Sequence, residues 1–340
     1  MENYADYEDF SVRAAVVGVG GAGSNLVNRM HSQGIKSAST IAINTDAKHL
    51  SMIGADKKLL IGKDVTRGMG AGGFPEVAAK AADVSRVDIA DAIKDYNLIF
   101  MAVGLGGGTG GGAGPIVAEM AKENGALVIA FATYPFSLER SRKAKADWSL
   151  ERLSRSADSV ILIENDRLLT YAPNLSIDKS FELVDNIASN AVKGIADAIK
   201  FPSLINIDFS DLGSVVRDSG IAMINIGFGT GSDKINGVIN STLKHPLLNV
   251  DMSGAKSALV HIAGGTSLTI DEVTRVGAGV TQNLDDNANV IFGARLNSEM
   301  QDQIRVMSVV TGVKPQFDYP VKMSRSTETD YSFLEGLESI

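Results

Sequence analysis

The 340-residue chain contains no cysteine. This absence excludes a disulfide scaffold, a thiolate zinc site, an iron–sulfur cluster and a cysteine nucleophile, and it is typical of a reducing compartment. The four histidines are scattered and have no spacing typical of metal ligands. Thiol chemistry and a histidine-based metal site are therefore not expected.

The chain also lacks long apolar runs and an excess of positive charge. Its longest apolar stretches, such as residues 126–132, are far shorter than the ~20 residues that span a bilayer. The acidic start, MENYADYEDF, has neither the basic nor the apolar region of a signal peptide. The net charge of −8 argues against a nucleic-acid surface, because a phosphate backbone requires a basic face. We expect a cytoplasmic protein with no nucleic-acid partner and no direct membrane insertion.

The apolar pattern of the first half predicts a parallel sheet. Apolar residues make up 44% of the chain and charged residues 21%, which is typical of a folded protein. Short apolar runs alternate with helical patterns, as in sheets that helices cover on both faces. The predicted strands are residues 13–19, 40–44, 97–103, 126–133 and 159–163, and the predicted helices are residues 24–33, 75–94, 115–124 and 139–156.

A long amphipathic helix is predicted over residues 178–200, where apolar residues recur at helical spacing and Pro202 follows. A smaller α/β domain follows this helix. Its predicted strands are residues 221–226, 258–263, 290–295 and 304–310, and its predicted helices are residues 234–244 and 270–283. The expected organisation is a first domain over residues 1–177 (1–11 mobile), a central helix over 178–201, a second domain over 202–312 and a tail over 313–340.

Glycine is abundant and clustered: the chain has 35 glycines, where the usual share of ~7% would give fewer. The first cluster, GVGGAG from Gly18 to Gly23, fits G-x-G-x-x-G between a predicted strand and a predicted helix. In that setting, backbone N–H groups and the helix N-terminus can hold a phosphate. With Asp46 available to bind a ribose, this region alone is compatible with a dinucleotide-binding oxidoreductase.

A second cluster, GLGGGTGGGAG from Gly104 to Gly114, argues against that interpretation. It again lies between a predicted strand and a predicted helix, and its successive backbone amides can face an anion. A third stretch, GMGAGG over residues 68–73, lies between the two clusters. Three such loops at one sheet edge favour a triphosphate over a single pyrophosphate. The chain has no G-x-x-x-x-G-K-[ST], so it is not a P-loop NTPase.

Five segments resemble motifs of one family in both order and spacing. GVGGAGSNLVNRM and AINTDAKHL resemble the first and second nucleotide loops of the FtsZ family, and RGMGAGGFPEVAAKAA resembles its γ-phosphate loop. GGGTGGGAGP is similar to the signature loop of the tubulin/FtsZ superfamily, and NIDFSD to the catalytic loop before the second domain. The resemblance spans roughly residues 12–312. It implies a self-assembling GTPase of cell division, with a parallel-sheet GTP-binding domain joined by a long central helix to a smaller α/β C-terminal activation domain.

The resemblance also implies a set of nucleotide-binding residues. Those near the phosphates and ribose are Gly20, Gly21, Asn25, Asn44, Asp46, Ala71, Gly72, Gly73, Gly107, Gly108, Thr109, Gly110 and Glu139. The family commonly has an arginine four positions after that glutamate. This chain has Lys143 there and Arg142 beside it, so both remain candidates. Mg²⁺ is expected mainly on the phosphates, without a protein metal site.

Guanine recognition is expected from Asn165, Phe181 and Asp185, which match the family's base contacts. A carboxylate can accept hydrogen bonds from both the N1–H and the N2 amino group of guanine, and it would repel the acceptor N1 of adenine. Asn186 is an alternative to Asp185. Phe181 either stacks on the base or packs in the helix core.

The predicted catalytic residues are Asn206, Asp208 and Asp211, in NIDFSD. Ligands bind at the carboxyl ends of parallel strands, and a helix over residues 178–200 carries the chain ~33 Å away from that edge. The two aspartates would therefore act on the nucleotide of a neighbour stacked head to tail, and such a contact repeated without closure makes a filament. The alternative role for Asp211 is to cap the following helix.

The last segment, residues 329–340, has apolar residues at helix-like spacing among acidic ones. It is expected to dock in a groove of a membrane adaptor or a regulatory division protein, with an unstructured end as the alternative. The resemblance implies a location at the mid-cell division site. The competing hypothesis within the superfamily is a relative that controls cell shape and hydrolyses GTP weakly.

Overall fold

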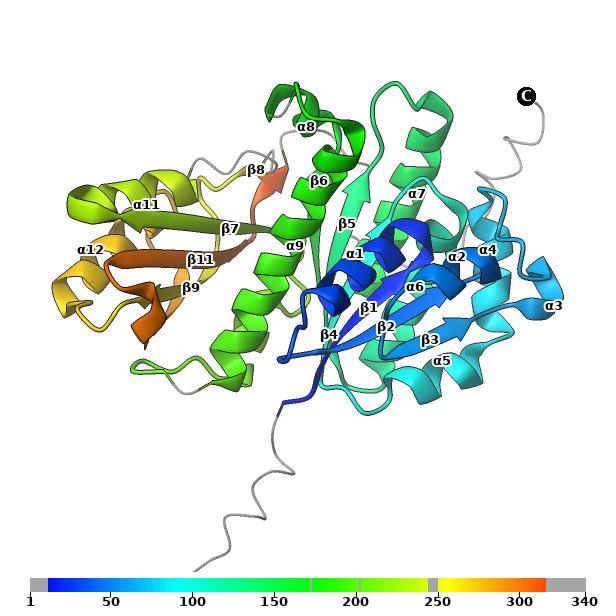
Figure 1. The fold of residues 1–340 in the computed structure, drawn as a ribbon, viewed down its shortest axis with the longest axis horizontal. Helices are drawn as coiled ribbons and strands as arrows, with labels where there is room; N and C mark the ends of the chain where they lie inside the picture. Colours follow the sequence, from blue (N-terminus) through cyan, green and yellow to red (C-terminus); the bar gives the residue numbers. More distant parts are fainter. Residues whose placement is uncertain (1–11, 172, 202, 244–249, 316–340) are drawn as a thin grey trace, which may run out of the picture.

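One continuous ten-stranded sheet runs through the computed structural model, which describes residues 12–171, 173–201, 203–243 and 250–315 (Figure 1). Its strands are β1 (Ala14–Val19), β2 (Ser39–Asn44), β3 (Lys57–Leu60), β4 (Leu98–Gly104), β5 (Leu127–Tyr134), β6 (Ser159–Glu164), β7 (Gly220–Thr230), β9 (Ser257–Gly264), β10 (Asn289–Leu296) and β11 (Gln303–Thr311). They lie in the order β10-β9-β11-β7-β6-β5-β4-β1-β2-β3. A separate pair joins β8 (Val250–Asp251) and β12 (Lys314–Pro315).

The strands from β3 to β7 are parallel, and the apolar composition of the central ones explains why. Every residue of β1 is buried, and β4 and β5 are buried along almost their whole length. Strands that read as continuous apolar runs need helices on both faces, as in parallel sheets. The α/β prediction for the first half is thus confirmed, and the predicted strands form with ends that differ by one residue.

The second half extends the same sheet. β7 pairs in parallel with β6 over only three residue pairs, from Ser159–Gly220 to Ile161–Ala222. It then continues to Thr230, four residues beyond the predicted end, and pairs antiparallel with β11. β11 pairs antiparallel with β9, and β9 pairs in parallel with β10. Local periodicity could not show this junction, because pairing between distant strands depends on tertiary packing.

Twelve α-helices belong to the described residues. They are α1 (Gly20–Ser32), α2 (Ala47–Met52), α3 (Lys63–Thr66), α4 (Pro75–Asp83), α5 (Arg86–Ile93), α6 (Gly108–Glu123), α7 (Arg140–Ser156), α8 (Asp166–Tyr171), α9 (Ile177–Lys200), α10 (Phe209–Val216), α11 (Lys234–Leu243) and α12 (Ile270–Thr281). None of them is long and apolar enough to cross a membrane.

Three helical predictions need correction. The helix predicted over residues 24–33 begins four residues earlier, at Gly20, within the first glycine cluster. The helix predicted over residues 75–94 is two helices, α4 and α5, and at the break between them the hydroxyl of Ser85 accepts a hydrogen bond from the Gly62 N–H. The helix predicted to begin at Pro115 begins seven residues earlier, at Gly108. Because glycine is unfavourable in a helix interior, the sequence of residues 104–114 predicts a loop there. Close packing overrides that preference: a Cβ on Gly112 would lie 1.9 Å from the Pro75 carbonyl oxygen.

Helix α9 crosses the molecule between the two halves of the sheet (Figure 1). Its 24 residues span about 36 Å at 1.5 Å per residue. Val184, Ala188, Ala191 and Ile195 form its buried stripe, as the apolar spacing predicts. The helix therefore links the carboxyl edge of the parallel strands to their amino edge. The predicted mobile residues 1–11 and most of the predicted tail, residues 316–340, lie outside the described residues.

A buried ion pair ties the junction of the two halves together. The carboxylate of Asp158 is fully buried, accepts a hydrogen bond from the Val128 N–H and lies 3.2 Å from the Lys122 ammonium. The carbonyl of Asp158 accepts a hydrogen bond from the Ser219 N–H just before β7. One residue thus connects β5, β6 and the start of β7.

Lys122→Met should lower the free energy of unfolding by about 3 kcal/mol, because it leaves a buried carboxylate without its cation. Urea unfolding followed by circular dichroism would measure the change. Lys94→Met is the matched control: the Lys94–Asp91 pair is exposed, so the change should stay within about 0.5 kcal/mol. Equal effects of the two substitutions would contradict this role of Lys122.

Candidate functional site

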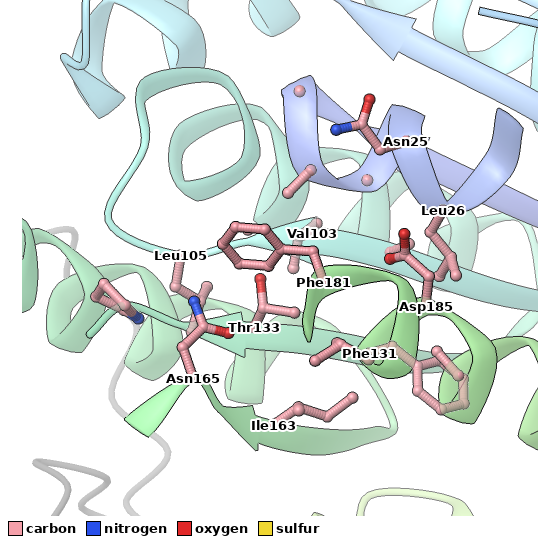
Figure 2. A pocket seen from close by; sticks show the side chains of 18 of the residues that line it. Asn25, Leu26, Val103, Leu105, Phe131, Thr133, Ile163, Asn165, Phe181 and Asp185 are labelled. Carbon is pink, nitrogen blue, oxygen red and sulfur yellow. The ribbon is translucent and has the colours of Figure 1, made fainter. Parts of the chain in front are cut away.

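A cavity of about 870 Å³ opens at the carboxyl ends of β4, β5 and β6. This is the edge at which parallel α/β sheets bind ligands. Helix α1 forms one wall through Asn25 and Leu26, and α9 forms the opposite wall through Phe181 and Asp185 (Figure 2). Strand residues such as Thr133 lie between the walls. The cavity has the size of a site for a nucleotide or a drug-sized ligand.

Two helix N-termini without side-chain caps meet beside this cavity. α1 begins at Gly20 and α6 at Gly108, and neither has a capping side chain or an acidic residue in its first turn. Helices α4 and α5 also lack a capping side chain, but each has an acidic residue in its first turn. Gly20 has φ +78°, and a Cβ there would lie 2.7 Å from the backbone nitrogen of Gly110. The free N–H groups of both helices therefore converge, which favours a bound anion.

The predicted γ-phosphate loop lies against the N-terminus of α6. A Cβ on Gly108 would lie 2.9 Å from the Ala71 Cβ and 3.2 Å from the Gly73 nitrogen. The ammonium of Lys145, on α7, donates a hydrogen bond of 2.8 Å to the Gly73 carbonyl. Ala71, Gly72 and Gly73 are thus adjacent to the uncapped helix ends, although they do not line the cavity itself.

Three other predicted phosphate-site side chains form hydrogen bonds to the protein itself, Thr109 to another loop and Asn44 and Asp46 within their own. The Thr109 hydroxyl lies 2.7 Å from the Thr45 hydroxyl, so in this loop it is the backbone that faces outward. The Asn44 amide oxygen accepts hydrogen bonds from the Thr45 and Asp46 N–H groups. The Asp46 carboxylate accepts one from the His49 N–H and caps α2. These contacts shape the second loop, and neither Asn44 nor Asp46 lines the cavity.

The two candidate cations on α7, Arg142 and Lys143, lie in different surroundings. Arg142 lines the cavity, donates from Nε to the Gly106 carbonyl at 3.2 Å and pairs with Glu139 at 2.5 Å. A Cβ on Gly106 would lie 2.7 Å from the Arg142 carbonyl oxygen, so only glycine allows α7 to pack this closely on the loop. Lys143 lies over the ring of Tyr134 instead, 6.0 Å from its centre. Glu139 and Arg142 therefore share the cavity wall, and Lys143 does not.

The three predicted base contacts converge on the same cavity (Figure 2). Phe181 is 41% exposed, so its ring is not part of the helix core, and it meets Phe136 edge-on at 6.2 Å. The amide oxygen of Asn165 is buried and has no hydrogen-bond partner among the described residues. An unpaired buried acceptor is costly unless a ligand pairs with it. The amide oxygen of Asn186, the alternative to Asp185, accepts a hydrogen bond of 3.3 Å from Gln33 Nε2, and Asn186 does not line the cavity.

Asp185 is a partly buried carboxylate with one cationic partner. Burial raises its pKa above the ordinary value, while the hydrogen bond and the charge of Arg29 oppose that shift. The Arg29 Nε lies 3.2 Å from Asp185 Oδ2, and its Nη1 lies 3.4 Å from Glu182. Sequence analysis missed Arg29, although its spacing of four from Asn25 places both residues on one face of α1.

Asn206, Asp208 and Asp211 lie at the opposite edge of the sheet. Asn206 and Asp208 line a second cavity of about 730 Å³, together with Arg13, Ala14 and Ser39 at the amino ends of β1 and β2. Asp208 is the N-cap of α10 and accepts from the Asp211 N–H at 2.8 Å. Asp211, at the third helical position, accepts from the Asp208 N–H at 2.9 Å. The helix cap is therefore Asp208, with Asp211 as its reciprocal partner, and the box occupies one oxygen of each carboxylate.

No group of three or more His, Asp or Glu side chains that could hold a metal ion occurs among the described residues.

The two predicted functional regions lie at opposite edges of the sheet. Predicted nucleotide contacts gather at the carboxyl edge, and the predicted catalytic carboxylates lie at the amino edge, with the length of α9 between them. One chain alone cannot bring both regions to the same phosphate.

Two family models match the chain. Residues 13–173 match the GTPase domain of the Tubulin/FtsZ family, and residues 220–314 match the C-terminal domain of the FtsZ family. The whole of α9 lies between the two matches.

Curated relatives are cell-division proteins of archaea. The chain is 50% identical over 314 residues to "Cell division protein FtsZ 2" of Methanocaldococcus jannaschii, covering 92% of this chain and 83% of that protein. It is 45% identical over 302 residues to the FtsZ 2 protein of Haloferax volcanii, covering 89% of this chain and 76% of that protein.

Solved structures agree with these matches. An empty FtsZ dimer of M. jannaschii superposes with a TM-score of 0.82 at 38% identity, covering 96% of this chain and all of that one. A GTPγS-bound protofilament of CetZ2 from Haloferax volcanii shares the fold, with a TM-score of 0.78 at 24% identity, covering 91% of this chain and 95% of that one. The chain belongs to the FtsZ family of cell-division proteins, and its first domain is the GTPase domain of the tubulin/FtsZ family.

Proposed function

We propose that this GTPase completes its active site between two subunits of a head-to-tail filament in the cell-division ring at mid-cell. The observation that carries the proposal is the distance between its two functional regions. Uncapped helix ends meet at the carboxyl edge of the sheet, and Asp208 and Asp211 lie at the amino edge. A contact that repeats without closure joins the two regions in every pair of neighbours and produces a filament.

In this proposal the GTPase domain, residues 1–177, holds the nucleotide. The backbone N–H groups at the starts of α1 and α6 bind the phosphates, aided by Gly20, Gly21 and the loop from Gly107 to Gly110. Ala71, Gly72 and Gly73 lie where a γ-phosphate would approach α6. Glu139 and Arg142 face the ribose and the phosphates from α7. Mg²⁺ binds mainly to phosphate oxygens, which are the hard ligands it prefers.

In this proposal, side chains of the cavity recognise the guanine base. The Asp185 carboxylate accepts from both donors of guanine, Asn165 contributes its amide, and Phe181 stacks on the ring. Adenine presents an acceptor where guanine presents its N1–H, so the same carboxylate repels it. The unpaired amide oxygen of Asn165 and the buried carboxylate of Asp185 both support a polar ligand at this end.

The central helix, residues 178–201, and the second domain, residues 202–312, carry the catalytic loop to the neighbour's nucleotide. Asn206, Asp208 and Asp211 orient and polarise the attacking water, as carboxylates and amides do in phosphoryl transfer. The capping box holds the two carboxylates in one arrangement before the neighbour arrives. A tail over residues 313–340 recruits a membrane adaptor or a regulatory division protein; from residue 316 on it lies outside the described residues.

Phosphate release from GTP, measured with Mg²⁺ over a series of protein concentrations, tests the shared site. Turnover per molecule should be low in dilute protein and rise above a threshold concentration, because assembly brings Asp208 and Asp211 to the phosphates. Sedimentation under the same conditions should show polymer above the same threshold. Turnover per molecule that stays constant with concentration would mean that one chain carries a complete site.

Asp211→Asn and Asp211→Ala separate catalysis from capping. Asparagine can still accept the Asp208 N–H but carries no charge, whereas alanine loses both. We expect both variants to bind GDP as the parent does and to hydrolyse GTP about 100-fold more slowly. Only Asp211→Ala should also lose about 1 kcal/mol of unfolding free energy. If Asp211→Asn hydrolyses GTP at the parent rate, Asp211 is only part of the cap.

Asp185→Ala should remove the preference for guanine. The parent should bind GDP about tenfold or more tightly than IDP, which lacks the N2 amino group, and the variant should bind the two alike. Isothermal titration calorimetry measures both affinities. Because burial raises the pKa of Asp185, GDP affinity should begin to fall at a higher pH than for an exposed aspartate as the solution is acidified. Asp185→Asn should flatten that dependence, and an unchanged pH profile would contradict the assignment.

A further inference from the structure

His49 lies where the first and second loops meet, and no role has been given to its side chain so far. It belongs to α2, and its imidazole reaches two asparagines. His49 Nδ1 lies 3.3 Å from Asn44 Nδ2, and His49 Nε2 lies 3.1 Å from Asn25 Oδ1. The imidazole thus connects the buried turn after β2 with α1, whose Asn25 lines the cavity.

The backbone determines which way the Asn44 amide points. Its oxygen accepts hydrogen bonds from the Thr45 N–H at 2.8 Å and from the Asp46 N–H at 3.3 Å. An exchanged amide would place its NH₂ group against these two donors, so the observed orientation is the favourable one. The Asn44 NH₂ group must therefore donate to His49 Nδ1.

That donation decides the protonation of the imidazole. A ring nitrogen that accepts a hydrogen bond carries no proton, so the neutral ring has its proton on Nε2. The His49 Nε2–H then donates to Asn25 Oδ1. With its oxygen occupied, the Asn25 amide has its NH₂ group available as a donor on the cavity side (Figure 2).

We propose that His49 is a positioning residue that holds the Asn25 amide with its NH₂ group toward the phosphates of the bound nucleotide. The proposal rests on the nucleotide site described under Proposed function. The relay runs from the backbone of the second loop through Asn44, His49 and Asn25. It couples the shape of the second loop to the phosphate affinity of the first, although His49 itself does not line the cavity.

Three substitutions of His49 test separately its donor to Asn25 and its acceptor for Asn44. His49→Gln keeps an NH₂ donor within reach of Asn25. His49→Asn keeps an acceptor for Asn44 but is too short to reach Asn25, and His49→Leu has neither group. His31→Leu is the matched control, because His31 hydrogen-bonds to Thr40 and pairs with Asp56, away from the cavity.

Equilibrium binding of GDP to the full chain is the measurement. We expect His49→Leu and His49→Asn to weaken GDP binding about five- to tenfold, the effect of one lost hydrogen bond, and His49→Gln and His31→Leu to stay within about twofold of the parent. The KM for GTP should rise in parallel, with kcat unchanged. Thermal unfolding of each ligand-free variant shows whether it is folded.

A double-mutant cycle with Asn25→Ala tests whether His49 acts through Asn25. In the Asn25→Ala background, His49→Leu should cause no further loss of GDP affinity, because the group that it orients is gone. Additive losses, or parent-like binding by His49→Leu, would overturn the proposal. A parent chain that binds no GDP would overturn the proposed nucleotide site itself. Imidazole ¹⁵N spectra of the parent should show the proton of His49 on Nε2, and a proton on Nδ1 would also contradict the relay.

Discussion

The close approach of α1 and α6 is the constraint on which the rest of the site depends. Their N-termini carry no capping side chains, and Gly20 meets Gly110 at a distance that no larger residue allows. Backbone N–H groups at two converging helix ends, brought together by glycines, favour a bound anion. The loop from Ala71 to Gly73 packs on the start of α6, and α7 packs at Arg142 on Gly106 just before it, so the predicted phosphate region is built around this contact.

The second constraint is the length of α9. Because the helix starts beside the cavity and ends near the amino edge of the sheet, the predicted binding groups and the predicted catalytic carboxylates cannot meet within one chain. The buried Asp158, paired with Lys122, anchors β7 to the parallel sheet and so holds the second half of the molecule against the first. These two rigid connections are the structural basis of the proposal that hydrolysis depends on assembly.

Side chains at the site mostly orient one another. Arg29 pairs with Asp185, Glu139 with Arg142, and the carboxylates of Asp208 and Asp211 hold each other's backbone. Each pairing leaves a defined donor or acceptor free for a ligand, and each limits the freedom that binding would otherwise have to remove. In the proposed relay, His49 extends the same principle to Asn25, whose amide oxygen lies 3.1 Å from His49 Nε2.

The sequence by itself determined the α/β class, nearly all strands, the central helix and the two glycine loops, because apolar periodicity and glycine clusters are local patterns. It also indicated Asp185, Asn165 and Phe181 through the family resemblance. Only the tertiary structure showed that Arg142 lines the cavity and the adjacent Lys143 does not, since α7 packs on Gly106 at Arg142. It likewise showed that α6 begins within the glycine run, that Asp208 is the cap of α10, that Arg29 contacts Asp185 and that His49 contacts Asn25. These features depend on contacts between segments far apart in the chain, which local patterns do not record.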